Sequence, residues 1–594
     1  MYTDFDIHEV PLRFPPARKK VEEFLGDSDL RVDDMDYYAV VTPMGGDEIL
    51  AAGGLLNDTI RCVAVRQDCR DEHLANRLVS HLIMMVGRRG YPSVKVITKP
   101  CNANIFHSMA FETIGRSDKA VFMENSMEPL SRYCHYLRSL RTEGRCGIIV
   151  INANPFTRGH RYLIEKAASE VNHLFIIPVK EERSAFSYME RKEMIEKGTR
   201  DLKNVTVCRG SAYTVSSSTF PSYFIKRLSD VTDSQIQIDL DIFSHFIAPS
   251  LNACVRFVGS EPTDPLTNRY NEMMEQMLPG KGIEVRCIER KAEDGAVISA
   301  SRVREALQRR SLTTAASLVV DTTVPYLISF LAKSALQEEL DTTPKPGLVD
   351  KDNNGAHNDM DHTLMTRSIQ TLHPFLTRFA EMCFHNTEPK MDLLRQVGCE
   401  AERAMLQATK GVNTHRGALF CMGLAIAATA YLARTKGAQN IDIDSLRRVI
   451  SSLASHVPPA SRTHGNYVCR NTSARGARSV AMGGYADLFE SWLPFLRKNK
   501  TDQWRNHKTL LLIMSMLDDT NIIYRTNSAT AQEVKRQSAQ LLENFTLRGL
   551  RAMDEQFIRK WISPGGSADM LSLTLFLVAV LPRDDNNCIL SYVL

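Results

Sequence analysis

The segment that most constrains this chain is a strand pattern that runs into a helix pattern through residues rich in Asn, Pro and Gly. Residues 146–151 are apolar and β-branched, which is typical of a buried parallel strand. Residues 161–168 have the spacing of an amphipathic helix. Between them stands Asn-Ala-Asn-Pro-Phe-Thr-Arg-Gly-His, residues 152–160. Because a helix N-terminus attracts anions, the sequence predicts an α/β sheet with a phosphate site here.

Two residues of this segment are suited to a phosphate. Gly159 lets a ligand approach the backbone, and His160 is placed to meet a phosphoryl oxygen. For the Gly-His pair alone, an ordinary strand-to-helix turn with a surface histidine is the alternative interpretation. A second segment about 140 residues later therefore matters to the argument.

That second segment is Ile-Ser-Ala-Ser-Arg-Val-Arg at residues 298–304, which also opens a helix pattern. Ser299 and Ser301 can cap the helix, and Arg304 can point toward a triphosphate. The two helix starts together resemble the nucleotidyltransferase superfamily, in which a carboxylate or phosphate attacks the α-phosphate of ATP. Taken with Phe-Val-Gly-Ser-Glu-Pro at residues 257–262 and the pair Tyr270-Asn271, they resemble the citrate lyase ligase family.

The resemblance implies a reaction with ATP and acetate. Acetate attacks the α-phosphate, pyrophosphate leaves, and acetyl-adenylate passes its acetyl group to the prosthetic-group thiol on the acyl-carrier subunit of citrate lyase. Mg²⁺ would bridge the phosphates, and catalysis is mostly positioning and charge neutralisation. His160 and Arg304 are the implied catalytic residues. The implied ATP-binding residues are Asn152, Asn154, Thr157, Gly159, His160, Gly259, Glu261, Ser299, Ser301 and Arg304.

Strand and helix patterns alternate around these motifs. The further strand-like segments are residues 173–179, 205–208, 255–259 and 283–288. This alternation predicts a doubly wound parallel sheet with ligands at the carboxyl ends of its strands. We place this nucleotidyltransferase-type domain at residues 141–312. Within it, Arg191 either reaches an anion or lies on a solvated helix face.

Residues 1–140 have a different pattern. Strand-like segments at 37–42, 48–56, 59–65 and 93–98 and a helix pattern at 72–86 resemble the N-acetyltransferase α+β fold. In that fold a Gly-rich segment after the central strand binds the pyrophosphate of coenzyme A. Here Asp71 and His73 stand where small residues would help. We therefore expect this domain to be non-catalytic, with a docking or structural role.

The second half of the chain is helical in pattern. We place a boundary at residues 313–322 and an all-α domain at 322–594. Its polar segments are residues 344–350, 355–361, 411–417, 518–521 and 563–569. Helical bundles gather substrate and metal sites from facing helices, and clustered carboxylates favour hard cations. For a single Asp the alternative is a helix cap or a solvated position.

These segments resemble triphosphoribosyl-dephospho-CoA synthase over about residues 332–576. That family joins C1′ of the ATP ribose to a ribose hydroxyl of dephospho-CoA and releases adenine. Carboxylates would stabilise the sugar cation, and one, which the sequence does not identify, would deprotonate the hydroxyl. The implied catalytic residues are Asp359, Asp361, Asp518 and Asp569. The implied metal ligands are Asp359, Asp361, Asp518 and Asp519. The implied substrate-binding residues are Lys345, Asn353, His357, Asn413, His415, Arg416 and Arg525.

One region departs from this family. Relatives have a glutamate in each of two motifs where this chain has Asn466 and Arg478. The change of two carboxylates to an amide and an arginine could weaken metal binding or alter nucleotide preference. One alternative is therefore a ligase fused to an impaired, nucleotide-binding helical domain. A generic adenylyltransferase is another.

Composition bounds these interpretations. A net charge of +4 does not favour nucleic acid as a partner. The scattered cysteines have no zinc-site spacing, and neither a signal sequence nor a membrane-spanning run is visible. We therefore expect a cytoplasmic protein without a membrane partner.

Both resemblances lead to one conclusion. The sequence predicts a bifunctional enzyme of citrate lyase maturation that uses ATP, acetate, dephospho-CoA and Mg²⁺, with the acyl-carrier subunit as its protein partner. Oligomeric state and metal stoichiometry stay open.

Overall fold

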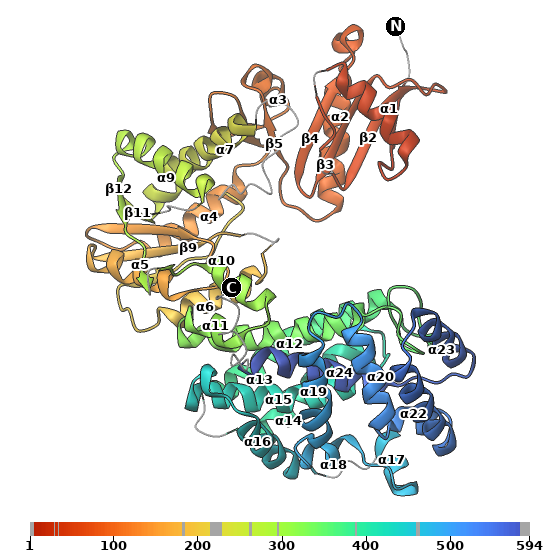
Figure 1. The fold of residues 1–594 in the computed structure, drawn as a ribbon. Helices are drawn as coiled ribbons and strands as arrows, with labels where there is room; N and C mark the ends of the chain where they lie inside the picture. Colours follow the sequence, from red (N-terminus) through yellow and green to blue (C-terminus); the bar gives the residue numbers. More distant parts are fainter. Residues whose placement is uncertain are drawn as a thin grey trace, which may run out of the picture. The chain divides into compact units, whose positions relative to one another are not determined.

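The computed structural model describes nine stretches of the chain (Figure 1). They are residues 5–28, 30–33, 35–180, 184–213, 228–260, 264–293, 296–385, 389–458 and 464–582. The chain divides into two compact units. The first comprises Met1–Asn154 and Gly159–Ile298, and the second comprises Pro155–Arg158 and Ser299–Leu594. This division separates the residues around the first phosphate motif, because its central loop belongs to the second unit.

The first unit begins with a seven-stranded sheet of order β1-β2-β3-β4-β5-β7-β6. All neighbouring strands are antiparallel except β4 and β5. The strands are β1 (Phe5–Glu9), β2 (Tyr37–Pro43), β3 (Ala51–Leu56), β4 (Thr59–Val65), β5 (Lys95–Thr98), β6 (Glu112–Arg116) and β7 (Val121–Glu124). The helices are α1 (Pro15–Gly26), α2 (Leu74–Arg88), α3 (Ala103–His107) and α4 (Glu128–Ser139). The sequence-predicted strands correspond to β2, β3, β4 and β5, and the predicted helix to α2.

Helix α2 forms because its apolar residues recur on one face. Leu74, Leu78, Leu82 and Val86 are buried at a spacing of four residues, which places them in one stripe against β2, β3 and β4. The segment before α2 is a short 3-10 helix, η1 (Gln67–Glu72), not a Gly-rich turn. His73 ends it with a left-handed backbone, φ 55°.

The second sheet of the first unit is parallel, with the order β10-β9-β8-β11-β12. Its strands are β8 (Cys146–Ile151), β9 (His173–Pro178), β10 (Val205–Val207), β11 (Ala253–Gly259) and β12 (Glu284–Ile288). Its helices are α5 (Arg158–Ser169), α6 (Tyr188–Gly198), α7 (Leu228–Ile242), α8 (Ala248–Ser250) and α9 (Pro265–Met277). All five predicted strands are confirmed. The direction of winding reverses between β8 and β11, where open parallel sheets bind ligands.

The two sheets of this unit share a hydrophobic core. Ile114 and Phe122 of the first sheet, Ile148 and Phe175 of the second, and Ile238 of α7 belong to one buried cluster. Helix α7 packs on β6 so closely that a Cβ on Gly115 would lie 2.8 Å from the Ile242 side chain. The two sheets therefore pack on one shared core and are not joined only through a free linker.

The second unit is helical throughout its described residues, apart from an isolated bridge between Thr157 and Val319. Its helices up to residue 455 are α10 (Ala300–Gln308), α11 (Leu312–Ser317), α12 (Val324–Asp341), α13 (His362–His385), α14 (Met391–Ala408), α15 (Arg416–Lys436) and α16 (Ile443–Ser455). Its later helices are α17 (His464–Asn471), α18 (Ala477–Met482), α19 (Leu493–Lys498), α20 (Arg505–Met516), α21 (Thr520–Arg525), α22 (Ser528–Glu543), α23 (Leu547–Arg559) and α24 (Gly565–Val580). The expected helical character of this half is confirmed.

Helices α12, α13, α15 and α24 pack on one another and form the centre of this unit (Figure 1). Helix α15 alone, among the described residues, is long and apolar enough to cross a membrane, and 78% of its apolar window is buried inside the protein. A helix that is apolar on all sides is expected in the core of a large helical domain. We therefore interpret α15 as a core helix.

Candidate active sites

The predicted phosphate motif, residues 152–160, follows β8 directly. Arg191 of α6 is fully buried, and its guanidinium donates to the Asn152 carbonyl at 2.8 Å, to Asn152 Oδ1 at 2.9 Å and to the Val179 carbonyl at 2.9 Å. It also donates to the Phe186 carbonyl at 3.2 Å. The solvated-face interpretation of Arg191 is therefore wrong, because this side chain ties together the ends of two strands.

The two asparagines of the motif shape the turn. Asn154 Oδ1 accepts a hydrogen bond from the Phe186 amide at 3.1 Å. Ala153 between them has a positive φ of 47°, which is uncommon for a residue other than glycine. Asn152 and Asn154 thus hold a turn that the backbone would not otherwise favour.

His160 lies in the first turn of α5. Burial, reinforced by the charge of Arg290, lowers the pKa of this imidazole to about 4. His160 is therefore neutral at pH 7 and can act on a phosphoryl oxygen by hydrogen bonding but not by charge.

Arg290, which sequence reasoning missed, lies next to two predicted ATP-binding residues. It influences His160, and a Cβ on Gly259 would lie 3.9 Å from Arg290 Nε. Its amide donates to Ser260 Oγ at 3.1 Å, and Asn271 Nδ2 donates to the Gly259 carbonyl at 3.0 Å. The position of Arg290 just past the carboxyl end of β12 was the available signal. Glu261, another predicted ATP-binding residue, lies outside the described residues.

Gly159 lies in the first turn of α5 and belongs to the first unit, whereas the last four predicted ATP-binding residues belong to the second. Ser299 caps α10, and its Oγ accepts from the Arg302 amide at 3.3 Å, as predicted. Ser301 Oγ instead accepts from the Arg304 guanidinium at 3.0 Å. Burial lowers the pKa of Arg304. Thr157 is buried and pairs with Val319 in an isolated antiparallel bridge.

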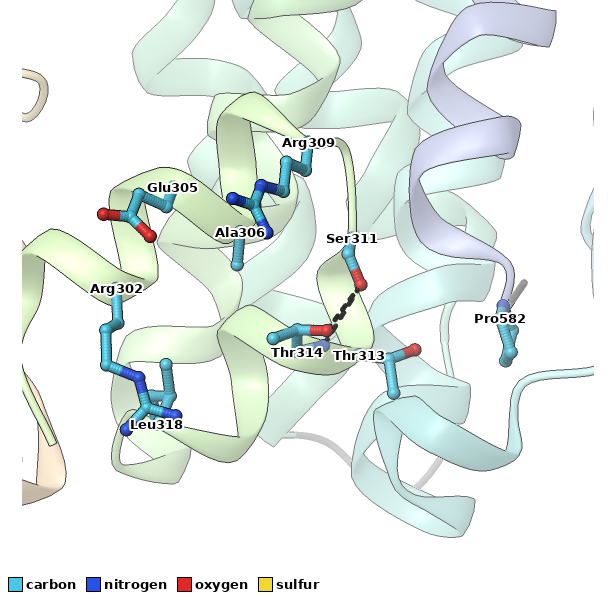
Figure 2. Close-up of a pocket in the computed structure, with 9 residues that line it drawn as sticks. All are labelled: Arg302, Glu305, Ala306, Arg309, Ser311, Thr313, Thr314, Leu318 and Pro582. Atoms are coloured by element: carbon cyan, nitrogen blue, oxygen red, sulfur yellow. Dashed lines mark hydrogen bonds between the residues drawn. The ribbon is translucent and has the colours of Figure 1, made fainter. Parts of the chain in front are cut away.

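A cavity of about 420 Å³ that sequence reasoning did not predict lies against α10 and α11 (Figure 2). Its lining residues include Arg302 within α10 and Arg309 at the end of that helix. Ser311, Thr313 and Thr314 line it from the start of α11. Ser311 Oγ and Thr314 Oγ1 lie 2.9 Å apart, as the dashed line in Figure 2 marks. None of these residues was among the predicted site residues.

In the helical domain, the polar segment at residues 344–350 contains one member of a buried ion pair. Lys345 Nζ donates to Glu339 Oε1 at 2.5 Å, and the two residues are 1% and 4% exposed. The Lys345 amide donates to Asp350 Oδ2 at 2.8 Å, which fixes the backbone of this segment. Burial raises the pKa of Glu339, while Lys345 acts to lower it. Glu339 carries no motif signal, because it sits in an apolar helix pattern.

Asn353 and His357 anchor the next polar segment to helices α21 and α23 and to the turn before α24. Asn353 Nδ2 donates to Asp554 Oδ2 at 3.0 Å, and His357 Nε2 lies 2.9 Å from Ser563 Oγ. Arg525 donates to the Ala356 carbonyl at 2.5 Å. Burial lowers the pKa of His357 to about 4, so this ring is neutral at pH 7.

Asp519 is buried, Asp569 keeps a partly exposed surface, and the two carboxyls are near enough to influence each other. Asp519 Oδ2 accepts from the amide and hydroxyl of Ser567 at 2.8 and 3.0 Å. Burial first, and then the charges of Asp519 and Glu339, raise the pKa of Asp569 well above its ordinary value. Asp569 lies against the start of α15, where a Cβ on Gly417 would be only 2.0 Å from Asp569 Oδ2. Gly417 is therefore required by the position of this carboxyl.

His415 precedes α15 and is 4% exposed. Thr414 Oγ1 donates to Ser368 Oγ at 2.7 Å, and Ser368 Oγ lies 2.8 Å from His415 Nδ1. Ser368 can therefore use its own proton toward Nδ1, which leaves the ring proton on Nε2. His415 Nε2 is buried and has no hydrogen-bond partner among the described residues. Burial and the charge of Lys345 lower the pKa of His415 to about 4.

The remaining predicted residues line a second cavity or pair with nearby groups. Asp359 and Asp361 line a cavity of about 320 Å³ with Asn354, Asn358 and Arg367. Asp518 pairs with Lys535 at 2.6 Å. Asn413 Oδ1 accepts from the amide of Arg416, and the Arg416 guanidinium forms an ion pair with Glu402.

A metal site is not brought together by this arrangement. Within the described part of the chain, no group of three or more His, Cys, Asp or Glu side chains could hold a metal ion. Both oxygens of Asp519 are already used by protein groups. The four predicted metal ligands therefore stay a prediction. Mg²⁺ usually takes one or two carboxylates beside substrate phosphates, and Asp359 and Asp361 in their cavity would fit that donor set.

The region that departs from the synthase pattern is only partly visible. Arg478 donates to the carbonyls of Val457 at 2.7 Å and Ser455 at 3.3 Å, which close the end of α16. Its guanidinium thus stabilises a helix C-terminus. Thr463 and the side chain of Asn466 lie outside the described residues.

The chain matches two enzyme families, a ligase and a transferase. The family model for the citrate lyase ligase C-terminal domain matches residues 146–327, and the model for ATP:dephospho-CoA triphosphoribosyl transferase matches residues 325–588. The citrate pro-3S-lyase ligases of Klebsiella pneumoniae and Escherichia coli (strain K12) are each 39% identical. They cover 55% and 53% of this chain, with 96% and 91% of their own lengths matched. The "Probable 2-(5''-triphosphoribosyl)-3'-dephosphocoenzyme-A synthase" of Streptococcus mutans is 36% identical over 42% of this chain and 94% of its own length.

The chain therefore belongs to the citrate lyase ligase family through its first part and to the triphosphoribosyl-dephospho-CoA synthase family through its second. The predicted fusion is confirmed, and both parts are of enzymatic families with a role in citrate lyase maturation. ATP is a substrate of families of this kind.

Proposed function

We propose that this chain carries out both reactions of its families. The first part acetylates the thiol of the citrate lyase prosthetic group on the acyl-carrier subunit, with ATP and acetate. The second part makes the prosthetic-group precursor from ATP and dephospho-CoA. The observation that carries the proposal is the near-complete match to a relative of each family, at 96% and 94% of the relatives' lengths. The setting is the cytoplasm, with no membrane or nucleic-acid partner.

We propose that the chain has three domains. Residues 1–140 form a non-catalytic domain, residues 141–312 form the ligase domain, and residues 322–594 form the synthase domain. Arg66 supports the first assignment. It begins the segment where coenzyme A pyrophosphate would bind, and its guanidinium pairs with Asp68 of that segment and with Glu48 before β3. Two carboxylates beside this arginine disfavour an anion.

In the ligase reaction an acetate oxygen attacks the α-phosphate, and the bond to pyrophosphate breaks. The thiol then attacks the acetyl carbon, and AMP leaves. We assign the phosphate contacts to His160 and Arg304 and place the adenine near Gly259 and Glu261. The other proposed ATP-binding residues are Asn152, Asn154, Thr157, Gly159, Ser299 and Ser301. Because His160 is neutral, the positive charge must come from arginine, and Arg290 beside Gly259 supports this. Mg²⁺ would neutralise further phosphate charge when bound.

In the synthase reaction the C1′–N bond of ATP breaks and a C1′–O bond to a ribose hydroxyl of dephospho-CoA forms. The hydroxyl proton passes to the leaving adenine. We propose Asp569 as the group that moves this proton, because burial beside Asp519 and Glu339 raises its pKa toward the range useful for proton transfer. Lys345 and His415 are proposed to bind the substrate, with His415 Nε2 donating a hydrogen bond.

The first experiment is mass spectrometry of a reaction with ATP, dephospho-CoA and Mg²⁺. Adenine release with a triphosphoribosyl adduct is expected from the native chain and should be lost in Asp569→Asn. Asp444→Asn, at an exposed position on α16, is the matched control. No adenine release from the folded native chain would instead favour an impaired synthase domain, for which Asn466 and Arg478 are the features in support.

A further inference from the structure

The loop at the proposed phosphate site of the ligase is held by the segment that leads into the helical domain. Thr157 forms an antiparallel bridge with Val319. The Arg158 amide donates to the Leu318 carbonyl at 3.0 Å, and the Arg158 guanidinium donates to the Ser317 carbonyl at 2.7 Å. Two consecutive residues of the loop, Thr157 and Arg158, are therefore hydrogen-bonded to residues 317–319.

Thr323 fastens the same loop from the start of α12. It is the N-cap residue of that helix, yet its side chain makes no capping hydrogen bond. Its hydroxyl instead donates to the Phe156 carbonyl at 3.1 Å. An N-cap threonine ordinarily accepts a bond from its own helix, so this hydroxyl is diverted to the loop.

These bonds are buried and so have no easy substitute. Thr323 and Phe156 are 0% exposed, and Thr157 and Val319 are 1% and 3% exposed. A buried hydrogen bond that is lost is not replaced by one to solvent, so its removal favours a shift of the loop. The direction of the loop also fixes the start of α5, whose first N–H groups are the expected phosphate contacts. The Arg158 N–H, bound to Leu318, is already committed.

We propose that residues 317–323 are a positioning clamp for the ligase phosphate loop, with Thr323 as its principal positioning residue. This inference rests on the proposed ligase function. Thr323 touches no reacting atom, and it acts through the Phe156 carbonyl on Thr157 and on the start of α5. Because Thr323 begins α12, which also carries Glu339 of the synthase centre, the ligase loop is attached to the first helix of the synthase scaffold.

The test uses the full chain with Thr323→Val, which removes the hydroxyl at nearly constant volume, and Thr323→Ser, which restores it. Acetate-dependent exchange of pyrophosphate into ATP reports the ligase, and adenine release reports the synthase in the same preparation. The matched control is Thr435→Val, which removes a hydroxyl-to-carbonyl bond of 2.8 Å inside α15.

We expect Thr323→Val to raise the KM for ATP about 10- to 100-fold in the exchange reaction, since small displacements of a binding group have effects of this size. Thr323→Ser should come within about threefold of the native value, and adenine release should be unchanged in both. A structural defect alone would lower both activities in parallel, which would overturn the clamp. An exchange reaction in Thr323→Val equal to that in Thr435→Val would overturn it as well. Absence of exchange in the native chain would instead refute the ligase function.

Discussion

Replacement of Lys345 should destabilise the helical domain more than the loss of an ordinary side chain would, because it leaves a buried charge without its partner. Lys345 and Glu339 are 1% and 4% exposed, and their charged groups lie 2.5 Å apart. In Lys345→Met the Glu339 carboxylate keeps its burial and loses its counter-charge. Breaking a buried pair in this way costs about 3–5 kcal/mol, whereas replacing both partners is often close to neutral. The double variant Lys345→Met/Glu339→Gln should therefore recover most of the lost free energy of unfolding.

The sign of the pH dependence follows from Glu339. Burial already raises the pKa of this carboxyl in the folded state, and loss of Lys345 raises it further. The folded variant then binds a proton that the unfolded chain releases above about pH 4.3. The stability of Lys345→Met should be greatest below that pH and should fall as pH rises through the folded-state pKa. Its deficit relative to the native chain should be larger at pH 8 than at pH 5.

Tryptophan fluorescence during urea unfolding is the suitable assay. The chain has three tryptophans, Trp492, Trp504 and Trp561, and all lie in the second unit. Fluorescence therefore reports the helical domain without interference from the first unit. Lys498→Met, at an exposed position on α19, is the control. A deficit below about 1 kcal/mol for Lys345→Met, or a double variant no more stable than the single one, would contradict the argument.

Three further outcomes are expected. Gly417→Ala should abolish adenine release while acetate-dependent exchange continues, because the new Cβ would lie 2.0 Å from Asp569 Oδ2. Retention of more than about a tenth of the adenine release would contradict the role given to Gly417 and Asp569. His160→Gln should lower the ligase kcat/KM about 10- to 100-fold. In the native chain the pH profile of the ligase should show no imidazole titration between pH 6 and 8, because the pKa of folded His160 is about 4. A clear inflection near pH 6.5 would show that His160 is not held neutral. Arg290→Met should weaken ATP binding to the ligase about tenfold or more and leave adenine release unchanged, whereas equal KM values would remove Arg290 from the site.

Much of the fold was accessible from local patterns. The strands β8, β9, β10, β11 and β12 were predicted because buried parallel strands are short, continuously apolar runs bounded by turn residues. Helical character beyond residue 312 followed from the loss of that alternation. Strands β1, β6 and β7 escaped prediction, because strands of four or five residues carry little periodic signal.

The candidate sites divide in the same way. Motif strings identified Lys345, Asp519, Asp569 and His415, since polar residues beside glycines in an apolar helical chain stand out. Glu339 was not predicted, because it stands in an apolar helix pattern without a motif around it, and only its burial shows that it belongs to the site.

What the sequence determined by itself is the chemistry: two nucleotide-using families, their order along the chain and most of the residues that carry their motifs. Only the tertiary structure decided the states of those residues. It makes His160 and His415 neutral and raises the pKa of Asp569, because desolvation depends on neighbours that are distant in sequence. It also turned Thr323 away from its own helix and onto the Phe156 carbonyl, a contact between residues 167 positions apart. Local pattern fixes which groups are present, and long-range packing fixes their charge and their partners.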